Sequence, residues 1–142
     1  MRAFLELQTW PDVSEALSRL RAAGIRMVFL SNFTEGMLDA AVRRCGLQGM
    51  FEAHLSTDRV RAYKPDPQAY RMAMDTLGLN QEEVAFAAFA GWDAAGAKAF
   101  GYPTFWVNRL NLPAEELSST ADAIGANLHD LVRFVSNRSV RA

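Results

Sequence analysis

Helical and strand-like patterns alternate along the chain from residue 13 to residue 135, and this alternation restricts the fold more than any other feature. Apolar residues at helical spacing predict helices over 13–23, 35–44, 68–77, 93–100 and 128–135. Short apolar runs predict strands over 25–30, 51–57, 84–90 and 104–107. Alternation of this kind is typical of an α/β fold, in which right-handed crossovers join parallel strands of one sheet.

Turn residues mark the ends of several elements. Gly24 follows the first helical pattern, and Asp12 or Ser14 could cap its start. The stretch 108–127 is rich in turn-forming residues and reads as a surface connection. The polar, basic tail 136–142 is expected to fray. The predicted domain therefore covers residues 13–135.

Length and composition exclude several classes of protein. A chain of 142 residues is expected to form one domain, and a net charge of −1 does not favour nucleic acid or an anionic membrane as a partner. No apolar run reaches the roughly 18 residues of a membrane span, and residues 1–12 do not resemble a signal peptide. The single cysteine, Cys45, fits a reducing compartment and reads as a packing residue at a helix end. By elimination, the expected location is the cytoplasm.

Polar residues with chemical potential follow three of the predicted strands. Ser31 and Asn32 follow the first strand, Lys64 follows the second beyond a loop, and Asp93 follows the third. Each has a structural explanation: a helix cap, a solvated loop lysine, and an acid at a helix N-terminus. Ligands of open parallel sheets, however, bind at the carboxyl ends of the strands. The joint placement of these residues at one edge therefore favours a functional site.

The same residues resemble the motifs of a known family. Leu30-Ser31-Asn32 resembles the second motif of the haloacid dehalogenase superfamily. The segment 64–67, followed by Tyr70, is similar to its third motif. The segment from Trp92 to Arg109 resembles the fourth motif of the type II 2-haloacid dehalogenase branch. The resemblance covers nearly the whole chain, from about residue 10 onward.

This resemblance implies a Rossmann-like core, a separate helical cap and a hydrolase that acts on short haloacids without a cofactor or metal. An Asp at the end of the first strand attacks carbon, displaces halide and is released from the ester by water. Ser31 and Asn32 are the implied residues at the second motif, where Ser31 would hydrogen-bond the substrate carboxylate or the nucleophile. Lys64 would keep the nucleophile ionised, and Asp93 would pair with Lys64 and help to place the water. The expected roles of Tyr70 and Trp92 are to support the pocket.

The chain departs from the family at its N-terminus. Residues 1–12 look like the end of the cap and its return linker, and no Asp follows an apolar strand upstream of Ser31. Asp12 precedes a helix and is a poor substitute. The missing strand is central in the family's sheet, so its neighbours would have unpaired backbone groups. The gap could close by direct pairing, by another strand such as Ala3–Leu7 (although a helix is favoured there), or by a second copy. We therefore expect a chain that is unstable or oligomeric alone, with a homodimer as one outcome.

A second departure lies before Trp92. Dehalogenases of this branch usually carry Ser and Asn where this chain has Ala88 and Ala90. Magnesium-dependent phosphatases of the superfamily need a carboxylate near Ala88, because hard cations require oxygen ligands. The sequence therefore predicts no magnesium site. A related phosphatase and a non-catalytic α/β module remain the alternatives to a dehalogenase.

Overall fold

Two parallel sheets, rather than one, form the centre of the molecule. The computed structural model describes residues 8–114 and 116–139. The helices are α1 (Val13–Ala22), α2 (Glu35–Arg44), α3 (Pro67–Leu77), α4 (Gly91–Phe100) and α5 (Leu128–Ser139), with short 3-10 helices η2 (Thr57–Val60) and η3 (Gln81–Glu83). The strands are β1 (Val28–Ser31), β2 (Ala53–Ser56), β3 (Phe86–Ala88), β4 (Thr104–Val107) and β5 (Ala123–Gly125).

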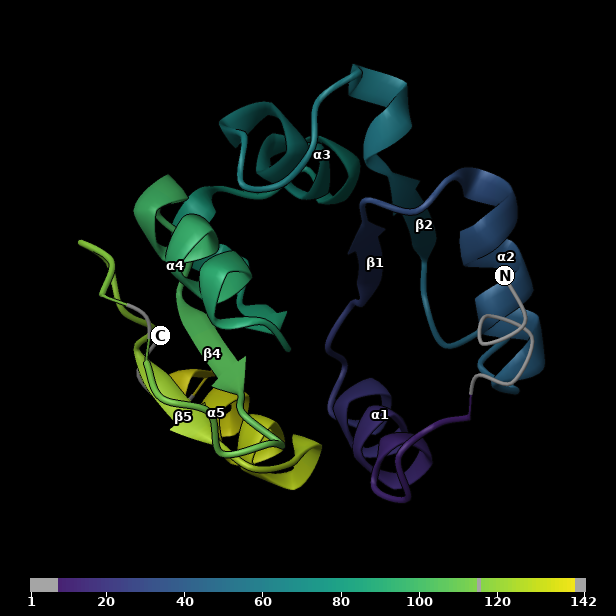
Figure 1. Cartoon of the computed structure of the whole chain (residues 1–142). Coiled ribbons are helices and arrows are strands. Elements are labelled where there is room, and N and C mark those ends of the chain that lie inside the picture. Colours follow the sequence, from purple (N-terminus) through teal and green to yellow (C-terminus); the bar gives the residue numbers. More distant parts are fainter. Residues whose placement is uncertain (1–7, 115, 140–142) are drawn as a thin grey trace.

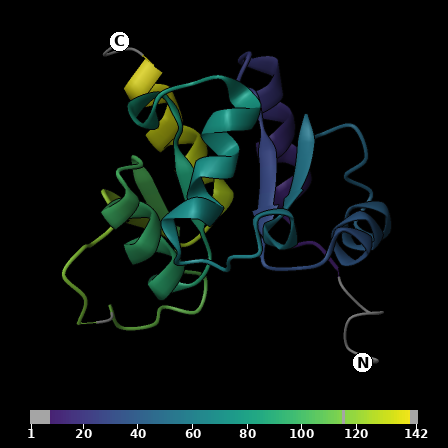
Figure 2. The same ribbon diagram turned by 90° about the horizontal axis from the view of Figure 1, so that it is seen from above.

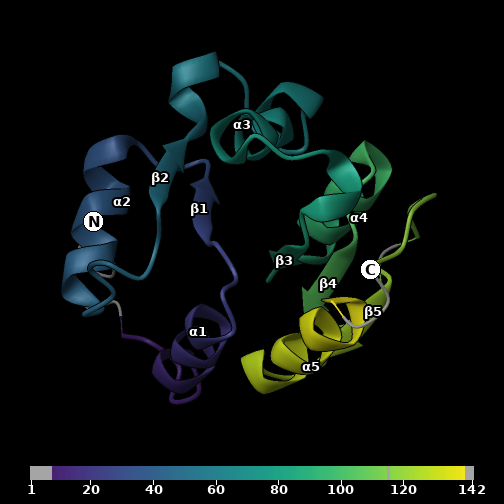
Figure 3. The same cartoon turned by 180° about the vertical axis from the view of Figure 1, so that it is seen from behind.

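All the strand pairs are parallel, as the helix–strand alternation predicts. β1 pairs with β2 in one sheet, with Val28 opposite Ala53. β3, β4 and β5 form the other sheet in that order. The predicted α/β class is confirmed, but the single sheet is divided between β1 and β3. Figure 3 shows these two strands facing one another with no strand drawn between them. Within the described residues, the gap has therefore not closed by direct pairing. Ala3–Leu7 lie outside the described residues.

Helices on both faces join the two sheets. On one face, α3 and α4 pack on a core that takes Leu30 from β1 and Phe86 and Ala88 from β3. On the other face, α1 packs against α5 over a second core, to which β4 contributes Phe105 and Val107 (Figures 1 and 2). The two sheets are thus held in one molecule by helix packing. No helix of the described residues is long and apolar enough to cross a membrane.

Two predicted boundaries were wrong. The stretch 108–127 contains β5, which escaped detection because it is three residues long and its central Ile124 is 57% exposed. The helix predicted over 128–135 continues to Ser139, so part of the predicted frayed tail is helical. Residues 136–139 are polar and exposed, and they carry no apolar periodicity that could have indicated a helix. The strand predicted over 104–107 is confirmed at both ends, whereas the strands predicted over 51–57 and 84–90 are shorter than their apolar runs, and the strand predicted over 25–30 spans Val28–Ser31.

Asp12 connects the starts of α1 and α5 rather than capping its own helix. Its Oδ2 accepts hydrogen bonds from Nη2 of Arg109 at 2.9 Å and from the backbone N–H of Leu128 at 2.7 Å. The guanidinium of Arg109 also lies over the Trp10 ring, 4.9 Å from its centroid. The Asp12 carboxylate therefore satisfies one of the free N–H groups of the first turn of α5.

Replacing Asp12 with Asn is expected to lower the free energy of unfolding at pH 7 by about 1–2 kcal/mol. Burial acts to raise the pKa of Asp12, but the hydrogen bonds from Arg109 and Leu128 outweigh it and hold the pKa below the ordinary 3.8. A lowered folded-state pKa stabilises the fold above 3.8, and this contribution is lost as the pH falls through the folded-state value. Urea unfolding from pH 7 to pH 2 should show the two proteins converging below 3.8. A constant difference would contradict the assignment.

Candidate functional site

A nearly buried ion pair between Lys64 and Asp93 forms the centre of the site. Lys64 lies in the loop between η2 and α3, and Asp93 lies in the first turn of α4. Nζ of Lys64 is 2.5 Å from Oδ2 of Asp93, and the two side chains are only 10% and 9% exposed. The ammonium group also lies 5.5 Å from the centroid of the Phe86 ring. A positive charge is thus fixed near the carboxyl end of β3, where it can stabilise an anion.

Tyr70 of α3 holds the other oxygen of Asp93. Its hydroxyl donates to Oδ1 of Asp93 at 2.8 Å, and the side chain is fully buried. Burial raises the pKa of Tyr70, and the neighbouring negative charge of Asp93 raises it further. Tyr70 therefore stays protonated at neutral pH and keeps donating to the carboxylate of Asp93. The backbone of Tyr70 is held in turn by Tyr102, whose hydroxyl donates to the backbone oxygen of Tyr70 at 2.5 Å. Burial raises the pKa of Tyr102 to about 12.

Asn32 connects the end of β1 to the same group. Its Oδ1 accepts the backbone N–H of Lys64 at 2.9 Å and the hydroxyl of Thr57 at 3.2 Å. Thr57 is fully buried at the start of η2. A continuous set of hydrogen bonds thus runs from Thr57 through Asn32 and Lys64 to Asp93, so the carboxyl ends of three strands converge on one place.

Ser31 ends β1 beside this group but is not bonded to it within the described residues. Its Oγ accepts the backbone N–H of Phe33 at 3.1 Å, which starts the turn into α2. The hydroxyl of Ser56, at the end of β2, donates to the backbone oxygen of Phe33 at 2.7 Å and accepts the N–H of Asp58. Both strand ends are therefore anchored to the same loop.

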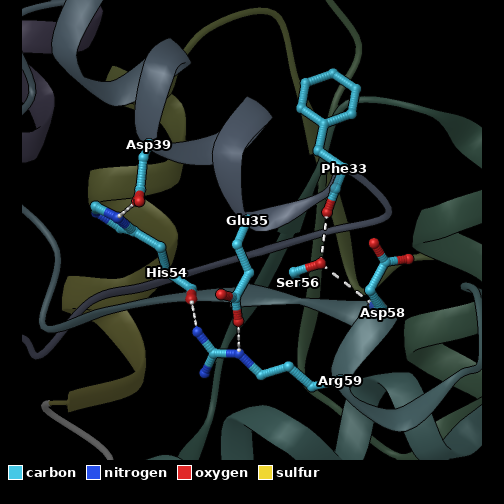
Figure 4. A network of polar contacts seen from close by, with 7 residues as sticks. All are labelled: Phe33, Glu35, Asp39, His54, Ser56, Asp58 and Arg59. Carbon is cyan, nitrogen blue, oxygen red and sulfur yellow. Dashed lines mark hydrogen bonds and ion pairs between the residues drawn. The ribbon is translucent and has the colours of Figure 1, made fainter.

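Ion pairs hold α2 against β2 near the loop that contains Phe33, as Figure 4 shows. Arg59 bonds Glu35 at the start of α2 and donates to the backbone oxygen of His54 at 3.1 Å. Nδ1 of His54 lies 3.0 Å from Oδ1 of Asp39. These contacts lie on the outer side of β2, and their side chains are partly exposed. We assign them to support of the loop that follows β1.

A glycine allows α4 to approach the site closely. A Cβ added at Gly96 would lie 2.6 Å from the hydroxyl of Tyr70 and 2.7 Å from Cβ of Pro65. Both distances are well inside van der Waals contact, and Pro65 is a rigid neighbour. The hydrogen bond between Tyr70 and Asp93 therefore depends on the absence of a side chain at this position.

Trp92 lies apart from the ion pair. Its side chain is 41% exposed and lines a groove of about 480 Å³ outside α4, together with Pro65, Gly96, Phe100 and Leu117. Neither this groove nor a second one of about 300 Å³ between α1 and α5 includes Ser31, Lys64 or Asp93. Among the sequence-predicted residues, the structure thus brings Asn32, Lys64, Tyr70 and Asp93 together. It places Ser31 next to them and Trp92 on a neighbouring surface.

Two contributors to the site were missed from the sequence. Thr57 looked like the end of a strand, and Gly96 looked like one small residue of a small-residue helix. Their contributions are visible only in the structure. The buried hydroxyl of Thr57 donates to the amide oxygen of Asn32, and a Cβ added at Gly96 would clash with Tyr70 and Pro65. Across 8–114 and 116–139, the side chains of His, Cys, Asp and Glu do not gather in groups of three that could hold a metal.

Comparison with known proteins identifies similar chains. A family model described as haloacid dehalogenase-like hydrolase matches residues 1–101. Haloacetate dehalogenase H-2 of Moraxella sp. (strain B) is 40% identical over 119 residues, which cover 84% of this chain and 53% of that enzyme. The chain thus spans about half the length of this curated relative.

Solved structures of dehalogenases superpose on this chain over most of its length. The crystal structure of an L-2-haloacid dehalogenase superposes with a TM-score of 0.91 at 38% identity, covering 95% of this chain and 60% of that one. The L-2-haloacid dehalogenase of Xanthobacter autotrophicus with chloropropionic acid covalently bound gives a TM-score of 0.87 at 30% identity, covering 95% and 64%. The relative placement of the two sheets is therefore that of longer chains.

Proposed function

Because the chain belongs to the haloacid dehalogenase-like hydrolases, we propose that the protein hydrolyses the carbon–halogen bond of a short 2-haloacid. The observation that carries the proposal is the nearly buried Lys64–Asp93 pair, held by Tyr70 at the carboxyl ends of the strands. Chemical support comes from a similar chain, an L-2-haloacid dehalogenase whose structure holds chloropropionic acid covalently. The expected ligand is a small molecule, and no nucleic acid, membrane or cofactor is invoked.

The proposed reaction has two steps. A carboxylate oxygen attacks carbon 2 of the haloacid, a carbon–oxygen bond forms, and halide leaves with the electrons of the carbon–halogen bond. Water then attacks the ester, which releases the 2-hydroxy acid and restores the carboxylate. Lys64 keeps the attacking carboxylate ionised, because a nearby cation lowers a carboxyl pKa. Asp93 and Tyr70 orient Lys64, Asn32 holds the backbone of Lys64, and Ser31 faces the substrate carboxylate. Trp92 lies on the neighbouring surface and has no part in these steps.

No nucleophile is assigned among the described residues that surround Lys64. Asp12 is the only Asp upstream of Ser31, and its carboxylate is bonded to Arg109 and Leu128 at the start of α5. A carboxylate held in this way is not available to attack carbon. We therefore propose that these 142 residues alone do not dehalogenate.

Chloride release from 2-chloropropionate tests the proposal. The 142-residue chain should give only the background rate. The longest open reading frame that contains this chain should release chloride, and Lys64→Met in that protein should lower the rate by about 10²-fold or more. Turnover of a chromogenic phosphate ester with magnesium, without chloride release, would assign a phosphatase instead. Inactivity of the longer protein in both assays would leave a non-catalytic module.

The edges of β1 and β3 that are unpaired within the described residues lead to an expectation about the chain alone. We expect a low melting temperature or self-association, of which a homodimer is the simplest form, because unpaired strand edges invite pairing with other chains. Sedimentation velocity and thermal unfolding at several concentrations measure both. A monomer with a high melting temperature at every concentration would contradict this expectation.

A further inference from the structure

The parallel register of β1 and β2 places Thr57 beside Asn32. Ser31, the last residue of β1, lies opposite Ser56, the last residue of β2. Continuing both strands by one residue brings Asn32 and Thr57 next to each other, although 25 positions separate them in the sequence. Thr57 is fully buried at the start of η2, whereas Asn32 is only half-buried. A buried hydroxyl thus lies directly behind a residue that reaches the surface of the site.

The carboxamide of Asn32 is held by its oxygen. The backbone nitrogen of Lys64 lies 2.9 Å from Oδ1 of Asn32. A backbone N–H can only donate, so the amide atom that faces it must be the oxygen and not the NH2 group. The hydroxyl of Thr57 donates to the same oxygen at 3.2 Å. Two donors from different segments therefore fix the orientation of this amide.

The bond from Lys64 to Asn32 anchors the loop 61–64, which leads from η2 toward α3. Within the described residues, the other backbone hydrogen bonds of this loop join residues three positions apart. The bond to Asn32, in contrast, spans 32 positions. The ammonium end of Lys64 is held separately, by Asp93. The place of the Lys64 backbone at the edge of the sheet therefore depends on Asn32.

Packing alone does not account for the hydroxyl of Thr57. Valine has nearly the same branched shape and would fill the same buried space. A buried hydroxyl is unfavourable unless it forms a hydrogen bond, and the bond that offsets this cost is the one to Asn32. Branching at Cβ also restricts the χ1 angle, so the surrounding core fixes the direction of the hydroxyl. Thr57 therefore supplies a rigid donor to the amide.

We propose that Thr57 is a positioning residue for the proposed dehalogenation. Its hydroxyl fixes the carboxamide of Asn32, and Asn32 in turn fixes the backbone of Lys64, whose ammonium group keeps the attacking carboxylate ionised. Thr57 itself forms no bond to the reacting atoms. The kinetic consequence rests on the proposed function, whereas the hold on Lys64 is a property of the 142 residues and can be measured without any reaction.

Hydrogen exchange at the Lys64 amide tests this hold in the 142-residue chain. In Thr57→Val, the oxygen of Asn32 keeps one donor instead of two, so the Lys64 N–H should exchange about fivefold faster or more. Thr57→Ser keeps a hydroxyl and should retain the slow exchange. Each rate is divided by that of the amides in the middle of α3, which corrects for changes in global stability. Circular dichroism checks that the variants fold.

Thr104→Val is the matched control. Thr104 is also fully buried, and its hydroxyl donates to the backbone oxygen of Tyr102 at 2.8 Å. Its loss should lower stability without changing the exchange at Lys64 relative to α3. A second variant tests the route through the amide: once Asn32→Ala has removed the acceptor, adding Thr57→Val should speed the exchange at Lys64 no further.

The pH dependence of chloride release tests the kinetic consequence in the longest open reading frame that contains this chain. A displaced Lys64 lowers the pKa of the attacking carboxylate less, so the acid limb of kcat/KM should move to higher pH in Thr57→Val. The value of kcat should fall about fivefold or more with KM little changed, because the lost bond supports the reacting groups rather than the binding of haloacid. Thr57→Ser should restore both quantities.

An unchanged relative exchange rate at Lys64 in Thr57→Val would overturn the proposal. Equal acceleration in Thr104→Val would do so too, because the effect would then be one of general stability. A fall in kcat with the acid limb in its original place would refute the action through Lys64. If the longer parent protein releases no chloride, the proposed function fails, whereas the exchange rates still decide whether Thr57 positions Lys64.

Discussion

Replacing Asp93 with Asn is expected to lower the free energy of unfolding by about 3–5 kcal/mol, which is the usual effect of leaving one partner of a buried ion pair unpaired. Asn keeps an oxygen for the hydroxyl of Tyr70, so the loss reports mainly on the uncompensated charge of Lys64, whose side chain is 10% exposed. Domains of this size are stabilised by only about 5–15 kcal/mol, so the change should be large in urea unfolding at pH 7.

A second variant distinguishes charge from packing at this position. Lys64→Met combined with Asp93→Asn removes both charges and is expected to recover most of the lost stability, because an apolar replacement of a buried pair is often neutral. The exposed pair between Arg26 and Glu52 provides a matched control, and removing Glu52 should change stability far less than Asp93→Asn does, because water screens both charges. Equal losses in the single and double variants at positions 64 and 93 would contradict the charge explanation.

Replacing Gly96 with Val is expected to cost about 2–3 kcal/mol, because the new side chain would overlap Pro65 and the hydroxyl of Tyr70. The overlap should also break the hydrogen bond from Tyr70 to Asp93, so that Asp93 holds Lys64 less firmly. Thermal and urea unfolding measure the loss of stability. The ultraviolet titration of the tyrosines should show one phenol with a lowered pKa, because Tyr70 would become less buried and would lie farther from the charge of Asp93.

Gly36 in α2 is the matched control, since a Cβ there would meet no atom within 4 Å. Gly36→Ala should raise stability by a few tenths to about 1 kcal/mol, because alanine favours the helix more than glycine does. A Gly96→Val protein as stable as the parent chain would show that α4 can shift away from α3, which would refute the close-approach explanation.

The class of fold and the centre of the site were predictable because each depends on local pattern. The bounds of α2 agree with the prediction at both ends, since Thr34 caps its start and Gly46 follows its end with a φ of 64°. Lys64 and Asp93 meet because both follow parallel strands that end at one edge.

Features that depend on packing between distant elements could not be predicted. The bond of Thr57 to Asn32 joins residues 25 positions apart, and nothing in either local sequence indicates it. Asp12 has the sequence context of a cap for α1, yet it bonds at the start of α5. β5 could not be predicted from the sequence, because it has only three residues and the central one is exposed. Its position depends on pairing with β4.

The contact between Asp12 and Leu128 spans 116 positions of sequence, and it bears on how the chain folds during synthesis. The core between α1 and α5 requires Leu131 and Val132, which leave the ribosome long after α1 does. Until then, the apolar face of α1, with Leu17 and Leu20, has no α5 to pack against. Contacts of such long range slow folding, because a large loop must close before they form. A nascent chain stalled before residue 128 is therefore expected to be a chaperone substrate, whereas synthesis through α5 lets the second core form.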